Sequence, residues 1–192
     1  MVGKRKSKVE ERERFSREAM VHLDHLYRVA FHLVRGQDEA RDFVQETYLR
    51  ALGSYEQFAP GTNMKAWLTR ILYNFFFDHY HQKKRWVSVD DETRGDGERP
   101  DYWEKVPTEN SGPESQILHK ELSVKITDSL RKIPEDFRAP IVLVDMGDFS
   151  YAEAADILSC PVGTVRSRLS RGRRLLHKYL RGYVGTQNEG VK

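Results

Sequence analysis

The stretch SYAEAADILSCPVGTVRSRLSRGRRLL, from Ser150 to Leu176, decides the fold of the second half of this chain. Ser150 and Glu153 have the spacing of a capping box, in which a hydroxyl and a carboxylate satisfy unpaired amides of the first helical turn. A helix is therefore predicted to begin at Tyr151. Pro161 cannot continue that helix, because proline lacks the amide hydrogen and clashes with the preceding turn. The helix should end near Ser159.

A second helix is predicted after Pro161, with two different faces. The apolar face, at helical spacing, consists of Val162, Val165, Leu169 and Leu176. The opposite face is polar and basic and consists of Gly163, Arg166, Ser167, Ser170, Arg171 and Arg174. No carboxylate occurs between Val162 and Tyr183. Two short helices, a tight turn and a cationic second helix predict a helix-turn-helix that enters the DNA major groove, in preference to a solvated surface helix.

The composition indicates a globular chain, with 192 residues, 39% hydrophobic and 32% charged, which allows one domain or two small ones. No stretch approaches the ~18 apolar residues of a membrane span, and the charged N-terminus lacks the apolar core of a signal peptide, so we expect a cytoplasmic protein. Cys160 is the single cysteine, which excludes an intrachain disulfide, and its place at the bend predicts a small buried residue. The histidine pair His22 and His25 lacks a third ligand, and we expect no metal, no cofactor and no catalysis.

Three helices are predicted in the first half, after a charged, frayed and partly helical arm at residues 1–18. Apolar residues recur at helical spacing across residues 22–34, 38–52 and 65–86. The second of these helices turns an acidic face outward, formed by Asp38, Asp42, Gln45, Glu46 and Leu49. Because an acidic face repels DNA, this one should bind a protein partner.

The third of these helices carries more aromatic surface than one packing face requires. The stripe expected to face the core consists of Trp67, Leu68, Ile71, Leu72 and Phe75. The remaining rings are Tyr73, Phe76, Phe77, Tyr80 and Trp86, and they stand among Lys65, Arg70, Lys83, Lys84 and Arg85. Aromatic rings at helical spacing are usually core residues. The surplus with its cations favours a nucleic-acid surface, on which bases stack while phosphates are neutralised.

Residues 87–113 are acidic, rich in glycine and proline and without periodicity, which predicts a flexible linker. A second module begins with a helix near Ser115 and continues with an apolar helix from Phe137 to Met146, which Gly147 ends. The helix-turn-helix completes it, and a polar tail follows. The chain is therefore predicted to be all-α, with two small helical domains joined by an acidic linker.

The order of these parts resembles an ECF (extracytoplasmic function) sigma factor of bacterial RNA polymerase, in the sigma-70 family. The resemblance rests on DFVQETYLRAL, GTNMKAWLTRILYN, the acidic linker and LRKIPEDFRAPIVLVDMGDFS followed by the helix-turn-helix, and covers residues 15–182. It implies this division: a flexible arm at 1–18, sigma region 2 at 19–86, the linker at 87–113, sigma region 4 at 114–183 and a tail at 184–192.

The resemblance also implies roles for particular residues. The acidic helix would dock on the clamp coiled coil of the largest polymerase subunit. A base flipped from the non-template strand of the minus-ten element would be captured by Phe58, Asn63, Lys65, Arg70 and Asn74. The minus-thirty-five element would be read by Gly163, Thr164, Arg166, Ser167, Ser170, Arg171 and Arg174. The GTN at residues 61–63 resembles the branch controlled by zinc-binding, thiol-responsive anti-sigma proteins, so an anti-sigma partner is expected.

We therefore expect a protein that directs promoter-specific transcription initiation in an alternative or stress-response regulon, with core RNA polymerase and promoter DNA as partners. The alternative is a helix-turn-helix regulator that is not a polymerase subunit, which leaves the acidic face and the aromatic helix unexplained. An enzyme is a third interpretation, but the chain has no HExxH motif and no glycine loop that could cradle a phosphate.

Overall fold

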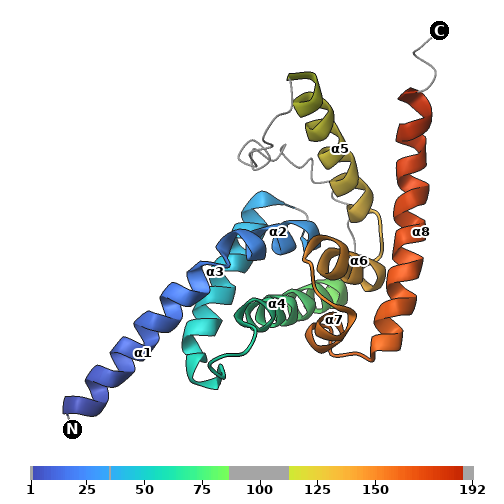
Figure 1. The fold of residues 1–192 in the computed structure, drawn as a ribbon. Helices are drawn as coiled ribbons and strands as arrows, with labels where there is room; N and C mark the ends of the chain where they lie inside the picture. Colours follow the sequence, from blue (N-terminus) through green and yellow to red (C-terminus); the bar gives the residue numbers. More distant parts are fainter. Residues whose placement is uncertain (1, 35, 87–112, 188–192) are drawn as a thin grey trace.

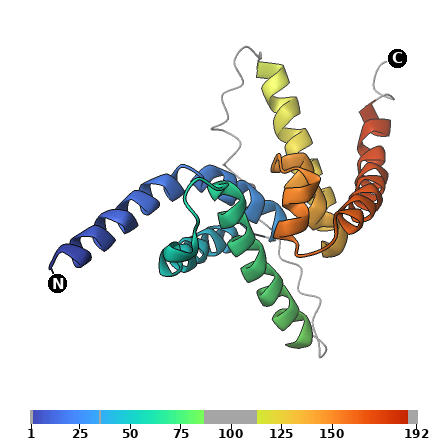
Figure 2. The same ribbon diagram turned by 60° about the horizontal axis from the view of Figure 1, so that its bottom comes forward.

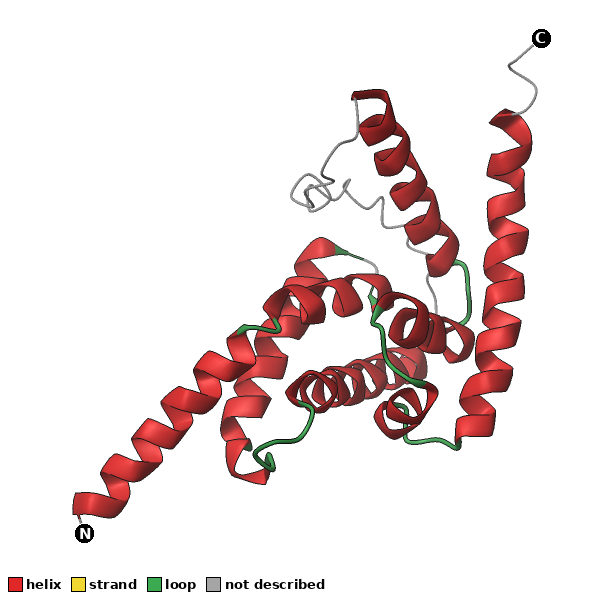
Figure 3. Ribbon diagram, in the orientation of Figure 1, coloured by secondary structure: helices red, strands yellow, loops and turns green. Residues whose placement is uncertain are grey.

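The computed structural model describes residues 2–34, 36–86 and 113–187, with side chains described for 8–34, 36–81 and 121–181. Every long element in these ranges is a helix (Figure 3), which confirms the all-α prediction. Within the same ranges no helix is both long enough and apolar enough to span a membrane. The predicted linker lies outside the described residues, except for Pro113, which begins a helix instead of ending the linker. Proline is well tolerated at that first helical position.

The N-terminal unit consists of four helices, and the first of them corrects the predicted frayed arm. α1 (Val2–Met20) is a continuous helix whose first turns project away from the body of the molecule (Figures 1 and 2). Phe15 and Ala19 anchor its last turns, at 6% and 1% exposure. The Phe15 ring packs 5.8 Å from that of Trp67, measured between centroids. Two apolar residues one turn apart were enough to fix a helix that is otherwise charged.

The other helices of this unit are α2 (Leu23–Leu33), α3 (Gln37–Gly53) and α4 (Met64–Trp86), with a short 3-10 turn, η1 (Tyr55–Gln57), before α4. Their common core includes Leu26, Leu68 and Leu72, each fully buried. α2 buries most of its surface and keeps one exposed face, which includes Asp24 and Arg28. It contacts α3 and α4 within its own unit and α5, α6 and the turn that follows α6 in the other.

The C-terminal unit contains α5 (Pro113–Arg131), α6 (Glu135–Ile141), a π-helical turn η3 (Val142–Met146), α7 (Tyr151–Ile157) and α8 (Val162–Gln187). The predicted apolar helix at 137–146 is thus divided into two parts. Pro140 lies inside α6, where it removes one backbone hydrogen bond and favours a wider turn after it. α8 continues into the predicted tail as far as Gln187, because lengthening an established helix costs little.

The capping box at the start of α7 is confirmed in both directions. The Glu153 amide donates to Ser150 Oγ (3.2 Å), and the Ser150 amide donates to Glu153 Oε2 (2.9 Å). At the other end Ser159 adopts a left-handed φ of 49°, and the Cys160 amide donates to the Ala155 carbonyl (3.0 Å). The chain then enters α8 directly after Pro161, as the sequence predicts.

The two units pack against each other and share one hydrophobic core. Fully buried residues of the C-terminal unit, Val142 and Leu143 among them, belong to the same cluster as Leu68 and Leu72. α7 lies between α4 and α8 (Figures 1 and 2), and α2 lies against η3. The sequence predicted two tethered modules but gave no basis for this close contact.

Candidate nucleic-acid interface

The predicted DNA-reading side of α8 is presented to solvent. We call it the upstream face, formed by Gly163, Thr164, Arg166, Ser167, Ser170, Arg171 and Arg174. All of these residues are exposed except Thr164, which is half-buried. On the opposite side Val165 and Leu169 are buried at 0% and 1% exposure. The separation into a packing face and a basic face is therefore present in the folded chain.

Two other arginines of α8, Arg168 and Arg173, form ion pairs with carboxylates of the C-terminal unit. Arg168 Nη2 lies 3.0 Å from Asp136 Oδ1 of α6. Arg173 Nε donates to Asp145 Oδ2 (3.0 Å), and its Nη2 donates to the other oxygen of the same carboxylate. These ion pairs tie α8 to α6 and η3. The arginines of the upstream face, in contrast, are exposed and form no ion pair with a carboxylate among the side chains that the structure describes.

A well-defined turn precedes α4. The Thr62 amide donates to the Ala59 carbonyl (3.2 Å), and Gly61 has a φ of 84°. Proline and glycine at the two central positions are the residues that a type II turn requires. Asn63 follows as the N-cap residue of α4, because its Oδ1 accepts a hydrogen bond from the Ala66 amide (3.1 Å). The capping role of Asn63 was not predicted, although an asparagine before a helical pattern is a recognised signal.

Residues 58–63 are held by an aromatic cluster. We call them the strand loop, because the resemblance assigns Phe58 and Asn63 to a separated DNA strand. The Phe58 ring lies 6.0 Å from Phe15 and 5.4 Å from Trp67, with the rings edge to face. Phe58 is half-buried in this cluster and supports the loop. Because Phe15 comes from α1, the helix that replaces the predicted arm also shapes this part of the candidate site.

The strand loop and α4 face the C-terminal unit across a contact that we call the seam, with α7 and residues 147–149 on its other side. Asn63 Nδ2 donates to Glu153 Oε1 (2.7 Å). Lys65 Nζ donates to the Gly147 carbonyl (2.7 Å) and lies 4.7 Å from the centre of the Phe149 ring. Two residues predicted to meet DNA are thus bonded to the other unit.

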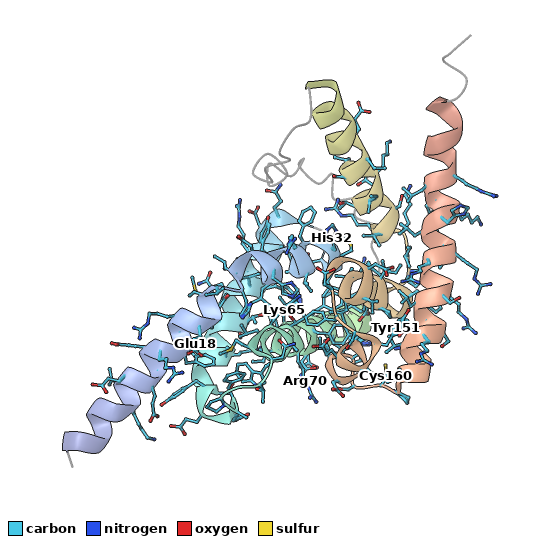
Figure 4. The ribbon with its side chains drawn as sticks, viewed as in Figure 1. Glu18, His32, Lys65, Arg70, Tyr151 and Cys160 are labelled. Atoms are coloured by element: carbon cyan, nitrogen blue, oxygen red, sulfur yellow. The ribbon has the colours of Figure 1, made fainter. Side chains whose placement is uncertain are left out.

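Arg70 and Asn74 lie further along α4 and differ in their surroundings. Arg70 lines a surface pocket whose other residues all come from the C-terminal unit: Ala155, Asp156, Ser159, Cys160 and Pro161. Figure 4 shows Arg70 and Cys160 at this edge of the molecule. Asn74 is exposed, one turn beyond Arg70. Cys160 is half-buried and packs against the core, so its predicted burial is confirmed only in part.

The surplus aromatic residues of α4 are mostly packing residues. Tyr73 and Phe76, predicted to face nucleic acid, are buried at 8% and 4% exposure, while Phe77 is 44% exposed. Burial raises the pKa of the Tyr73 phenol, and Glu135 of α6 raises it further. The second apolar side of α4 therefore belongs largely to the core: Tyr73 lies beside Glu135 of the C-terminal unit, and the Phe76 ring lies 6.3 Å from that of Phe43 in α3. Trp86 and the basic residues 83–85 lie outside the described side chains.

The acidic face of α3 lies on the surface, as predicted. Asp38, Asp42 and Gln45 are exposed, and Leu49 is 58% exposed between them and the end of the helix. Glu46 is half-buried and accepts a hydrogen bond from Arg50 Nε (2.7 Å). This surface combines one apolar side chain with carboxylates, which suits a protein partner better than DNA.

Two histidines of α2 are buried, and His25 lies beside the seam. His25 Nε2 is 3.2 Å from Thr69 Oγ1, and that hydroxyl donates to the Lys65 carbonyl (2.8 Å). We infer that Nε2 carries the hydrogen of a neutral ring. Burial, followed by the charges of Lys65 and Arg28, lowers the pKa of His25 to about 3. Burial lowers the pKa of His32 to about 4, with contributions from Arg131 and Arg28.

The part of the chain that the structure describes contains no cluster of three or more histidine, cysteine, aspartate or glutamate side chains that could hold a metal ion. The arrangement instead offers three surfaces. These are a basic face on α8, a polar and cationic edge at the strand loop and α4, and an acidic face on α3. Such surfaces bind other macromolecules.

Two family models match the chain, and they match its two units in order. "Sigma-70 region 2" matches residues 19–86, and "Sigma-70, region 4" matches residues 123–176. These ranges coincide with the helices that carry the strand loop and the acidic face, and with those that carry the upstream face.

Curated relatives agree over most of the chain. It is 38% identical over 160 residues to the ECF RNA polymerase sigma factor SigE of Mycolicibacterium smegmatis, spanning 83% of this chain and 58% of that relative. It is 31% identical over 183 residues to the ECF RNA polymerase sigma factor SigW of Bacillus subtilis, spanning 94% and 97%. Among solved structures, the sigma factor RpoE from Bartonella quintana, co-crystallised with the anti-sigma factor NepR, superimposes with a TM-score of 0.68, 29% identity and coverage of 88% and 98%.

Proposed function

The chain belongs to the ECF RNA polymerase sigma factors of the sigma-70 family, which direct promoter-specific transcription initiation, and from this premise we propose how its surfaces divide that task. Region 4, the C-terminal unit, reads the double-stranded minus-thirty-five element. Region 2, the N-terminal unit, captures the separated strand of the minus-ten element and docks on core RNA polymerase. The observation that carries this proposal is the presence of a solvent-facing basic helix and a solvent-facing acidic helix in separate units.

Readout of the upstream element rests on the arginines of the upstream face. Arg166, Arg171 and Arg174 project from a helix whose opposite side is fixed in the core. A guanidinium can donate two hydrogen bonds to O6 and N7 of a guanine, which contributes roughly 1–3 kcal/mol of discrimination. Ser167 and Ser170 stand between them and can bond to phosphates or bases.

Capture of the downstream strand rests on the strand loop and α4. Flipping a base out of the duplex costs a few kcal/mol, and stacking it on a protein wall returns about 1–3 kcal/mol. Strand separation is therefore close to balanced, and a few hydrogen bonds decide it. Asn63 and Asn74 offer amide donors and acceptors to a base edge, and Lys65 and Arg70 offer charges to phosphates.

Docking on the polymerase rests on the acidic face. Leu49 is an exposed apolar side chain with carboxylates one and two turns before it. A buried apolar contact surrounded by complementary charge is the usual arrangement of a specific interface. The partner surface would be basic around an apolar pocket, and we assign it to the clamp coiled coil of the largest subunit.

An anti-sigma protein is the second proposed protein partner. The support is the likeness to RpoE, whose structure was determined together with the anti-sigma factor NepR. A zinc-binding anti-sigma protein is favoured by the GTN at residues 61–63. The cytoplasm, where bacterial polymerase transcribes, is the proposed site of action. Promoter recognition of this kind uses binding energy and assigns no catalytic residue to the chain.

Run-off transcription tests the proposal. Core polymerase is supplied with genomic promoter fragments, with and without the purified chain, and the transcripts are sequenced from their 5′ ends. The chain should produce new transcripts that share two upstream sequence elements. A regulator that is not a polymerase subunit would act only on holoenzyme that already contains another sigma factor. Initiation by core polymerase that is the same with and without the chain contradicts the proposal.

A further inference from the structure

The seam uses the same side chains that the proposed function assigns to the downstream strand. Asn63 donates its amide hydrogen to Glu153 Oε1 over 2.7 Å, and Lys65 donates to the Gly147 carbonyl over 2.7 Å. These amide and ammonium groups are the donors that a base edge and a phosphate would need. In this conformation region 4 of the same chain already satisfies them.

Glu153 connects the two units. Its Oε2 accepts hydrogen bonds from the Ser150 amide (2.9 Å) and the Ser150 hydroxyl (2.8 Å), while Oε1 accepts the one from Asn63. The Ser150 amide and hydroxyl lower the pKa of Glu153, and Asn63 and Lys65 lower it further, so the group is an anion at neutral pH. An anion beside an amide and an ammonium offers region 2 the chemistry that a DNA phosphate would offer.

Packing supports these polar bonds over a wider area. Phe149, next to the Lys65 bond, is 3% exposed, and its ring meets that of His25 edge to face at 5.4 Å. Tyr73 and Phe76 of α4 are buried on the side that the sequence assigned to nucleic acid. Region 4 therefore contacts the strand-binding edge of region 2 at Asn63 and Lys65, through hydrogen bonds and the packing of Phe149, while Asn74 further along α4 stays exposed.

The upstream face is not covered in the same way. Gly163, Arg166, Ser167, Ser170, Arg171 and Arg174 are all exposed in the conformation that closes the seam. The contact thus affects one DNA-binding surface and leaves the other accessible. This asymmetry distinguishes the seam from a general collapse of the two units.

Promoter geometry makes the closed seam incompatible with full promoter binding. The minus-ten and minus-thirty-five elements are separated by about 25 base pairs, or roughly 85 Å along the duplex at 3.4 Å per base pair. The seam instead holds the strand loop in direct contact with α7, which packs on α8. Region 2 and region 4 must separate before each can lie on its own element.

We propose that region 4 is a competitive occupant of the strand-binding site of region 2, with Glu153 in the place of the DNA strand. The free chain can meet the upstream duplex, but it cannot hold the downstream strand until the seam opens. Docking of both regions on core polymerase opens it. This inference rests on the proposed function, because it takes the strand loop to be a DNA-binding site.

The first test measures the distance between the two regions in the full-length chain. Dyes are attached at Asp24→Cys on α2 and Lys178→Cys on α8, both exposed positions, with Cys160→Ala to remove the native thiol. Energy transfer should report one short distance in the free chain and a longer one after core polymerase is added. A distance that stays short in the polymerase-bound chain overturns the inference. Failure to bind core polymerase at all counts against the proposed function instead.

The variant Asn63→Asp should open the seam while the sequence of region 4 stays unchanged. The new carboxylate can still cap α4, as aspartate does well, but it faces the carboxylate of Glu153. The separated population should rise about tenfold, since a hydrogen bond to a charged group is lost and repulsion replaces it. Ser150→Ala is the matched control, because it removes a capping bond of α7 and keeps the Asn63–Glu153 bond. An unchanged distance distribution in Asn63→Asp overturns the inference.

The second test measures DNA affinity, using a fluorescent single strand that carries the non-template sequence of a promoter identified by run-off transcription. Glu153→Ala should bind this strand about tenfold more tightly than the parent chain, because Asn63 is released from a charge-assisted hydrogen bond and Lys65 loses a neighbouring anion. Ser150→Ala should bind it as the parent does. Both variants weaken the cap of α7, so they should bind an upstream duplex equally. Equal strand affinity in all three proteins overturns the inference.

Discussion

At the scale of single residues, position on α8 separates arginines that the sequence shows as one basic run. Arg171 lies on the upstream face and is exposed. Arg173, two residues later, donates two hydrogen bonds to Asp145 and ties α8 to η3. The Arg171 side chain is available to bind DNA, whereas the Arg173 side chain holds α8 against η3.

Alanine substitutions should separate these two roles. Arg171→Ala should lower transcription from promoters that need the upstream element by about 5- to 150-fold, the loss of one guanine contact of 1–3 kcal/mol, without changing the melting temperature. Arg173→Ala should lower the melting temperature through loss of an ion pair, with a smaller effect on promoter choice. Run-off transcription and thermal unfolding measure the two effects. Equal activity of Arg171→Ala and the parent at matched protein concentration would count against the assignment.

His25 makes the stability of the chain sensitive to acid. Its pKa is lowered to about 3 in the folded chain by burial and then by Lys65, whereas a histidine in an unfolded chain has a pKa of about 6.5. The unfolded state therefore takes up a proton first as the pH falls. The contribution to stability is complete above pH about 6.5 and decreases as the pH falls toward 3.

His25→Gln should reduce this acid sensitivity, because glutamine can still donate to Thr69 and does not titrate. Between pH 6 and 4 the free energy of unfolding should fall less steeply than in the parent, by up to about 1.4 kcal/mol per pH unit. His177→Gln, at an exposed position of α8, should leave the slope unchanged. Urea unfolding at a series of pH values measures it. The same slope in His25→Gln and the parent would show that His25 does not titrate as described.

At the scale of elements, α6 and α8 cross so closely that only glycine fits at position 172. A Cβ atom there would lie 2.5 Å from the Phe137 carbonyl oxygen and 2.8 Å from Ile141 Cδ1. Nothing lies within 4 Å of the corresponding atom at Gly163. Gly172 and Gly163 of α8 therefore differ in how much space surrounds them.

This contrast gives a matched pair of stability measurements. Gly172→Ala should destabilise the chain by about 1–3 kcal/mol, the usual cost of overpacking a close contact. Gly163→Ala should leave stability unchanged or raise it by up to about 1 kcal/mol, because alanine favours the helix. Thermal unfolding followed by circular dichroism compares both with the parent. A loss of similar size in both variants would contradict the close crossing.

The sequence predicted the elements whose signals are local. Ser150 and Glu153 predict the start of α7 through one hydrogen-bond pattern, and that start is correct. Pro161 predicts an end near Ser159, and α7 ends two residues earlier, at Ile157. α1 was missed because its anchors, Phe15 and Ala19, are few and their partners lie in a distant part of the chain. The strand loop was located by resemblance, but its cap by Asn63 was not foreseen.

At the scale of the whole molecule, the contact between the two regions could not be predicted from the sequence. The rings of Tyr73 and Phe76 were the visible signal, an apolar surplus that one packing face did not explain. Local periodicity could not decide whether nucleic acid or another part of the chain covers such a surface. The structure places Tyr73 and Phe76 in a core that both regions share, while the exposed basic and acidic faces agree with the prediction.

Asn74 should matter for strand opening and not for upstream binding. It is exposed on α4 in region 2, far in sequence from the upstream face. Asn74→Ala should reduce the permanganate reactivity of thymines in the downstream element several-fold, because one or two hydrogen bonds to a flipped base are lost. Protection of the upstream element in the same complexes should be unchanged. Loss of both signals together would place Asn74 in polymerase docking instead.

The same footprint, read with and without the chain, tests the central claim most directly. Core polymerase and promoter DNA are treated with permanganate in the presence and absence of the purified protein. Thymines of the downstream element should become reactive only when the chain is present, together with protection of the upstream element. Thymines that remain unreactive in a complex containing core polymerase and the chain would contradict the claim that this protein directs promoter opening.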